Sequence, residues 1–127
     1  MKQIIQTDKA PAPVGPYSAV VGFNDLIFVS GQGPVDPKTG TLKEGLREQA
    51  RQTLDNIKNI LEDVGSSMQH VLKVNVYLSD MNNFFEFNEI YAQYFPKNPP
   101  ARTCIQAGRL PFDIMVEIEV IACKKEK

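Results

Sequence analysis

An arginine that follows two prolines is the first candidate for chemistry in this 127-residue sequence. Pro99 and Pro100 hold the backbone extended, so Arg102 enters a predicted strand from a fixed direction. A guanidinium group offers a rigid fork of N–H donors that suits a carboxylate. Two partners fit this setting: a small organic anion, or a structural ion pair with Glu117 or Glu119.

Glu117 is the second candidate, because acids are depleted at strand positions such as this one between Val116 and Ile118. In a partly dry cleft the pKa of its carboxyl group would rise, and the group could exchange protons with a water molecule. The alternative is a solvated outer face that Glu117 shares with Glu119.

Cys104 lies two residues after Arg102, so both side chains are expected on the same face of a strand. A nucleophilic thiolate needs a base or a positively charged neighbour. His70 is the only histidine and is remote in the sequence. We therefore expect an unreactive, buried cysteine whose backbone N–H can contact a ligand.

Two glycine-containing loops and one asparagine are further candidates. Gly15–Ser18, which contains Tyr17, and Ser30–Pro34, which contains Gly31, would let backbone amides approach a ligand, although each could be only a turn. A Gly-x-Gly without a following helix is no phosphate or dinucleotide motif. Asn88 suits a solvated position or a tether between a helix and a loop.

Hydrophobic periodicity predicts the elements that position these residues. Helices are expected over 46–64, ended by Gly65, and from 82 or 83 to 95. Strands are expected at 4–7, 18–23, 26–30, 71–78, 102–107 and 115–122, with Leu72, Val74, Val76 and Leu78 sharing one face. The order β-β-β-α-β-α-β-β predicts an α+β fold, a mixed β-sheet with two helices packed on one face.

The other face of this sheet is expected to be mixed in polarity. In the last strand, Glu117 and Glu119 share a face with Met115, Ile121 and Cys123. Such a face would expose apolar area on a monomer, so we expect it to pack against another subunit of a cyclic homo-oligomer.

Length and composition set the broad class. The length argues for one domain spanning 1–127. The net charge of −1 argues against nucleic-acid and anionic-membrane partners. Cys104 and Cys123 have no metal or redox spacing, and the start of the sequence resembles neither a secretory signal nor a membrane span. We expect a soluble, cytoplasmic protein with free thiols and no metal site.

Six motifs in order resemble the reactive-intermediate deaminase family, also called the Rid or YjgF family, and in particular its archetypal imine deaminase subgroup. The motifs are Gly15-Pro-Tyr-Ser18, Ser30-Gly-Gln32, Asn88-Glu-x-Tyr91, Pro100-Ala-Arg-Thr-Cys104, Leu110-Pro111 and Val116-Glu-Ile-Glu119.

This resemblance implies a fold like that of the bacterial chorismate mutases, a homotrimer with clefts between subunits, and no cofactor. It implies hydrolysis of 2-imino acids, such as 2-iminobutanoate and 2-iminopropanoate, to 2-keto acids and ammonia. Arg102 would clamp the substrate carboxylate, Cys104 would contribute a backbone contact, and Glu117 would position or activate water.

The resemblance also implies that Tyr17, Ser30, Gly31 and Asn88 shape the cleft, with the tyrosine coming from a neighbouring subunit. The sequence departs from the family pattern at Ala19, where glutamine is common, and at Phe112–Met115, where a short Lys-Gly or Lys-Asp turn is usual. The second change puts apolar bulk near the expected cleft. Two other functions stay open: a regulatory module that binds a small carboxylate, and an endoribonuclease or translation inhibitor.

Overall fold

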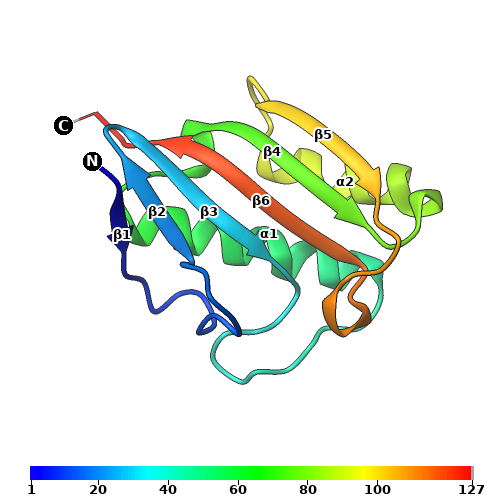
Figure 1. Ribbon diagram of the computed structural model, residues 1–127. Coiled ribbons are helices and arrows are strands. Elements are labelled where there is room, and N and C mark those ends of the chain that lie inside the picture. The colour runs from blue at the N-terminus through cyan, green and yellow to red at the C-terminus, as the bar shows by residue number, and fades with distance from the viewer. Residues whose placement is uncertain (127) are drawn as a thin grey trace.

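One six-stranded sheet forms the centre of the protein in this computed structural model, which describes residues 1–126. The strands lie in the order β1-β2-β3-β6-β4-β5 (Figure 1). Only β4 and β5 are parallel neighbours; the other pairs are antiparallel. The strand bounds are β1 Gln3–Ile5, β2 Val20–Phe23, β3 Leu26–Gln32, β4 Val71–Leu78, β5 Ala101–Gln106 and β6 Val116–Cys123.

Two α-helices cover one face of the sheet, α1 (Leu46–Asp63) and α2 (Phe84–Tyr94) (Figure 1). The apolar stripe of α1 is buried, and the helix ends before Gly65, which has a positive φ of 91°. Short 3-10 turns lie at Met68–His70, Met81–Asn83 and Pro111–Asp113. The predicted α+β fold and element order are confirmed, with strand bounds that differ from the predicted ones by one to two residues at most ends.

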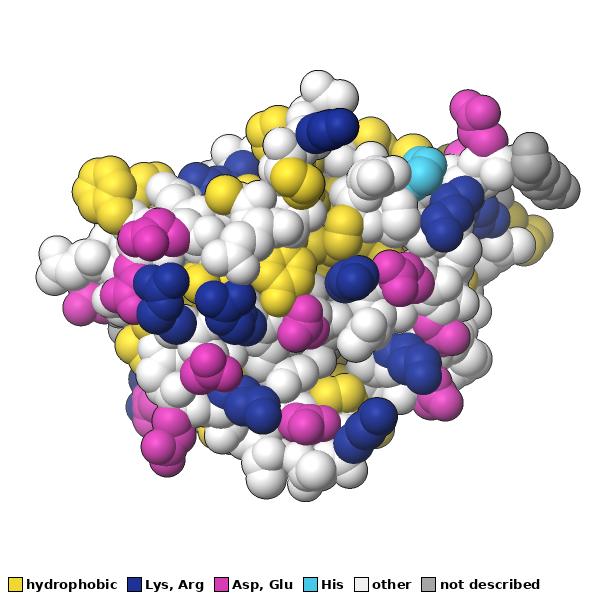
Figure 2. Space-filling view, turned by 180° about the vertical axis from the view of Figure 1, so that it is seen from behind, with side chains coloured by type: hydrophobic (Ala, Val, Ile, Leu, Met, Phe, Trp, Pro, Cys, Tyr) yellow, Lys and Arg dark blue, Asp and Glu magenta, His cyan; other side chains and the backbone are white. Residues whose placement is uncertain are grey.

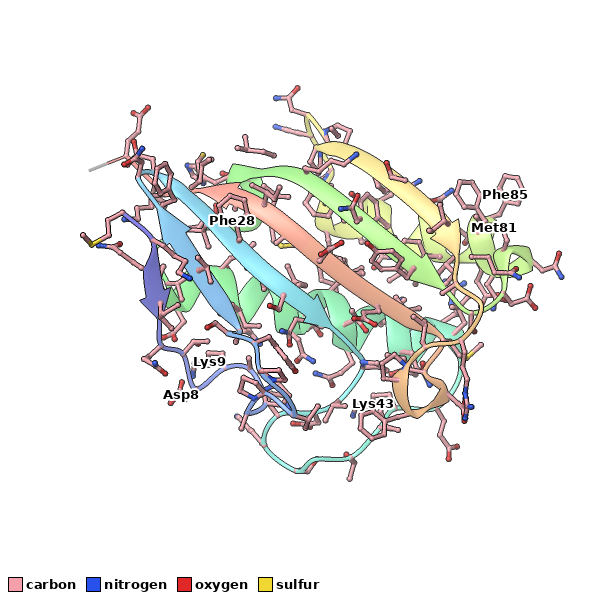
Figure 3. The ribbon with its side chains drawn as sticks, viewed as in Figure 1. Asp8, Lys9, Phe28, Lys43, Met81 and Phe85 are labelled. Carbon is pink, nitrogen blue, oxygen red and sulfur yellow. The ribbon has the colours of Figure 1, made fainter. Side chains whose placement is uncertain are left out.

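The two faces of the sheet differ as the alternation in the last strand predicts. Val116, Ile118, Val120 and Ala122 of β6 are buried beneath the helices, while the residues between them are half-buried on the other face. We call this second face the open face. Phe28 of β3 lies on it and keeps 38% of its surface exposed (Figure 3). Apolar surface therefore remains uncovered on a single chain.

The prediction for the start of β4 was wrong. Leu72 is 48% exposed and Val71 is buried instead, because the pairing of β4 with β6 shifts between Val71 and Lys73. A bulge of this kind reverses the faces on which the preceding residues lie. Val74, Val76 and Leu78 do share the buried face.

Candidate functional site

Arg102 lies in a cradle of uncharged groups. Its Nη1 donates a hydrogen bond to Oδ1 of Asn88 at 2.9 Å. The guanidinium carbon lies 4.6 Å from the ring centre of Tyr91 and 5.7 Å from that of Phe84, which are cation–π distances. Among residues 1–126, no carboxylate forms an ion pair with Arg102. The alternative of an ion pair with Glu117 or Glu119 is therefore contradicted, and the positive charge stays available to an anion.

The cradle follows from the geometry of α2. Phe84, Asn88 and Tyr91 are four and then three residues apart, so they share one face of the helix. Arg102 in β5 pairs with the buried Val74 of β4, which places its side chain on the helix side of the sheet. Asn88 is thus a tether, but between a helix and a strand.

Tyr91, like Phe84, makes a contact with Arg102 that sequence reasoning did not foresee. Its hydroxyl oxygen is buried and has no hydrogen-bond partner among the described residues. Burial raises the pKa of Tyr91 to about 12, and the nearby charge of Arg102 opposes this shift. The ring, and not the hydroxyl group, therefore carries the contact with the guanidinium.

Cys104 lies on the same side as Arg102, as predicted, because it pairs with the buried Val76. Burial raises the pKa of the thiol, and Arg102 only partly opposes this. A thiol with a raised pKa is a poor nucleophile near neutral pH, which agrees with the expected unreactive role.

Glu117 is on the open face of β6, where it packs against Gly31 of β3. A Cβ atom on Gly31 would collide with Oε1 of Glu117 and lie 3.0 Å from its Cδ. Burial, and then the charge of Glu119, raise the pKa of Glu117. The neighbouring Glu119 accepts hydrogen bonds from the Tyr77 hydroxyl group and, at 3.3 Å, from Asn75. Glu117 is therefore the freer of the two carboxylates.

A cavity of about 200 Å³ opens beside Glu117. Tyr17 and Gly31 line it, together with loop residues that include Phe112 and Ile114. Ser30 adjoins it and donates a hydrogen bond from Oγ to the Ser18 carbonyl oxygen at 2.6 Å, which ties β3 to the loop that carries Tyr17. Figure 1 shows these loops gathered where β3 ends and β6 begins.

Two buried polar side chains of α1 hold the loops around the cavity. Asn56 donates to the carbonyl oxygens of Gly33 and Val35 at 3.0 and 2.7 Å. Gln49 accepts from the backbone N–H of Met115 at 2.7 Å and donates to the carbonyl oxygen of Lys43 at 3.0 Å. Lys43 is labelled in Figure 3. The two residues break the apolar pattern of the buried helix face, and that break is the sequence signal that could have identified them.

The candidate residues thus form two groups in one chain. We call Asn88, Arg102 and Cys104 the arginine half-site, and Tyr17, Ser30, Gly31 and Glu117 the glutamate half-site. From the pairing of β5 and β6 with β4, the Cα atoms of Arg102 and Glu117 are about 14 Å apart. Their side chains also leave opposite faces of the sheet. A single chain therefore does not bring the two half-sites together.

Neither half-site has the composition of a metal centre. Across residues 1–126, the structure contains no group of three His, Cys, Asp or Glu side chains that could hold a metal ion. In the same residues, no helix has the length and apolar composition needed to cross a membrane.

Comparison with known proteins identifies the family to which this chain belongs. The family model described as endoribonuclease L-PSP matches residues 7–124. The chain belongs to this family. This family is the Rid or YjgF family that the sequence motifs indicate. Membership of the chain in it supports a Rid-type function in general.

Individual family members cover nearly the whole chain. A RutC family protein of Pyrococcus horikoshii is 49% identical over 98% of this chain and 100% of its own length. A protein named putative reactive intermediate deaminase TdcF, from Escherichia coli, is 41% identical over 98% of both chains. The crystal structure of E. coli TdcF with bound serine matches with a TM-score of 0.91 and 40% identity, over 97% of this chain and 99% of that one.

Proposed function

We propose that this protein hydrolyses reactive 2-imino acids, such as 2-iminobutanoate and 2-iminopropanoate, to 2-keto acids and ammonia, in clefts between the subunits of a homotrimer. The observation that carries the proposal is the cradle of Arg102. A half-buried guanidinium held by an amide and two aromatic rings, with no ion-paired carboxylate among residues 1–126, is suited to a small carboxylate ligand.

The separation of the half-sites supports a site between subunits. A small imino acid cannot reach from Arg102 to Glu117 of the same chain, but an arginine half-site can meet the glutamate half-site of a neighbour. Phe28 and Ile105 expose 38% and 47% of their surfaces on the open face, which favours contact with further copies. A cyclic trimer would form three equivalent clefts in this way.

The proposed reaction begins when Arg102 of one subunit binds the substrate carboxylate. The carboxylate of Glu117 of the next subunit takes a proton from a water molecule, whose oxygen forms a bond to C2 of the protonated imine. The resulting carbinolamine receives this proton on nitrogen. Its C–N bond then breaks, ammonia leaves, and the hydroxyl proton passes by way of the Glu117 carboxylate to the ammonia, so one protonated imine and one water give one 2-keto acid and one ammonium ion.

The arrangement of the remaining residues supports this chemistry. The raised pKa of Glu117 brings a carboxylate base closer to neutral pH, where proton transfer is more effective. Asn88 would orient Arg102, the backbone N–H of Cys104 would contact the substrate, and Tyr17, Ser30 and Gly31 would shape the opposite wall. A protonated imine is already electrophilic, so positioning and one base can supply much of the rate.

A coupled assay with a threonine dehydratase tests the activity. Wild-type protein should speed the release of 2-keto acid, and Arg102→Ala should lower this effect by at least about 100-fold. Glu117→Gln should lower it by about 10²–10⁴-fold. Full activity in the Arg102→Ala protein would contradict the proposed clamp.

Mixed oligomers test the site between subunits. Arg102→Ala and Glu117→Gln chains, each inactive alone, would be co-expressed in equal amounts. In a cyclic assembly about one quarter of the clefts would then combine an intact Arg102 with an intact Glu117, so about one quarter of the activity should return. No recovery in verified mixed oligomers would show that each site lies within one chain.

A second candidate function comes from the description of the family model, which names an endoribonuclease. Charges of both signs are interspersed over the helix face of this protein (Figure 2), and the net charge is −1. Neither favours binding to a polyanion. Nuclease activity in highly purified protein that disappears in Glu117→Ala would establish this second function. Binding of 2-keto acids without imine hydrolysis would instead indicate a regulatory module.

A further inference from the structure

The cavity beside Glu117 has a lining that suits hydrocarbon. Eight of the residues that line it are alanine, valine, isoleucine, proline or phenylalanine, among them Val14, Val35, Phe112 and Ile114. Glu117 is the only charged residue in this lining among the described residues. The base would therefore lie beside an otherwise largely apolar chamber.

We infer that this cavity binds the side chain of the substrate, and that Phe112 makes the enzyme prefer 2-imino acids with hydrocarbon side chains longer than methyl. The inference rests on the proposed function and adds a substrate class to it. C2 of a 2-imino acid carries three groups. The carboxylate would go to Arg102 of the neighbouring subunit, C2 and its nitrogen would face the water that Glu117 activates, and the side chain would be left to occupy the cavity.

The size of the cavity sets the range of side chains. Its volume is about 200 Å³. A dry apolar cavity of about 150 Å³ is large enough for benzene. Side chains from ethyl to benzyl therefore fit by volume. An acidic side chain would be placed near Glu117 in an apolar setting, which both like-charge repulsion and desolvation disfavour.

The turn that carries Phe112 is independently unusual. Phe112 and Asp113 have positive φ angles of 58° and 55°, a conformation that non-glycine residues rarely adopt. Nε and Nη2 of Arg109 donate to the two carboxylate oxygens of Asp113, at 2.8 and 3.3 Å, and so hold the turn. Strained backbone of this kind is concentrated at ligand-binding sites. Here it places an aromatic residue, 74% exposed, at the rim of the cavity.

A substrate series tests the preference. Imines would be produced in situ by an amino-acid oxidase from alanine, 2-aminobutyrate, norvaline, leucine, phenylalanine and glutamate, and kcat/KM would be measured from keto-acid release. Burial of each added methylene should raise kcat/KM about fourfold from alanine to norvaline. The glutamate-derived imine should react at least about tenfold more slowly than the norvaline-derived one. Equal values along the series, or a preference for glutamate, would overturn the inference.

Two variants assign the effect to the rim. Phe112→Ser should lower the ratio of kcat/KM between the norvaline- and alanine-derived imines by at least about threefold. Phe85→Ala is the matched control, because Phe85 is 78% exposed but lies outside the cavity lining, near the start of α2 (Figure 3). An unchanged ratio in Phe112→Ser would exclude the proposed role of Phe112.

The outcomes separate this inference from the proposed function. Hydrolysis of the alanine-derived imine without any gain along the series would refute only the side-chain subsite. No hydrolysis of any imine would refute the proposed function. Thermal stabilisation by the matching 2-keto acids would then still test the subsite without turnover. Stabilisation that grows from pyruvate to 2-oxopentanoate supports it, and stabilisation that does not grow refutes it.

Discussion

The contact between Gly31 and Glu117 gives the sharpest prediction, because it can be tested by replacing a single hydrogen atom of Gly31 with a methyl group. In Gly31→Ala, the new methyl group would collide with Oε1 of Glu117 and lie 3.0 Å from Cδ, whereas ordinary contacts begin at 3.4 Å. The carboxylate must move by about 1 Å, and misplacement on this scale can cost about 100-fold in rate. We therefore expect kcat in the coupled imine assay to fall about 100-fold.

The same substitution should leave the protein folded. Overpacking at such a site typically costs about 1–3 kcal/mol of unfolding free energy, which urea unfolding would measure. Gly108→Ala is the matched control, since a Cβ atom there would meet no atom within 4 Å beyond its chain neighbours, and it should change neither quantity. If Gly31→Ala keeps activity within threefold of wild type while a folded structure shows Glu117 displaced, the carboxylate does not position the water.

Three further predictions follow from single contacts. Tyr91→Phe should leave stability unchanged or raise it by up to about 1 kcal/mol in urea unfolding, because its buried hydroxyl group has no partner among residues 1–126; a loss above 1 kcal/mol would reveal a hidden hydrogen bond. The proposed mechanism requires ionised Glu117, so activity should be lost as the pH falls through the raised pKa of this carboxyl group. Glu119→Gln removes a charge that raises this pKa, so the acid limb of the kcat/KM profile should move to lower pH, and a shift to higher pH would contradict the assigned cause. Ser30→Ala removes the hydrogen bond to the Ser18 carbonyl oxygen and should lower the free energy of unfolding by about 1 kcal/mol. An unchanged free energy would show that water replaces this hydrogen bond in the variant.

The regular elements could be predicted because their burial is periodic. The stripe of α1 and the alternation of β6 each have one buried face, so the sequence specifies which side chains turn inward. Alternation along β5 likewise predicted that Arg102 and Cys104 share a side of the sheet. Alternation along β6 predicted that Glu117 lies on the opposite face from Ile118. These placements need only local spacing.

What could not be predicted depends on contacts between distant segments. The bulge that turns Leu72 outward depends on how β4 pairs with β6. An ion pair with Glu117 or Glu119 was one of two partners left open for Arg102, but within the chain the crossover through α2 brings Asn88 and Tyr91 to it instead. The positive φ angle of Phe112 has no signal in residue type, because glycine, asparagine and aspartate are the residues that favour this conformation. The roles assigned to Arg102, Glu117, Cys104, Tyr17, Ser30, Gly31 and Asn88 stay predictions until the variants are measured.

The position of β6 has a consequence for the order of folding. It is the last strand in sequence among the described residues, yet it lies between β3 and β4 and joins the two halves of the sheet. Until residues 116–123 have been synthesised, β1–β3 and β4–β5 have no common strand, and both would present unpaired edges to a chaperone or to another nascent chain. Because Glu117 is on this joining strand, the proposed base is in place only after the sheet has closed.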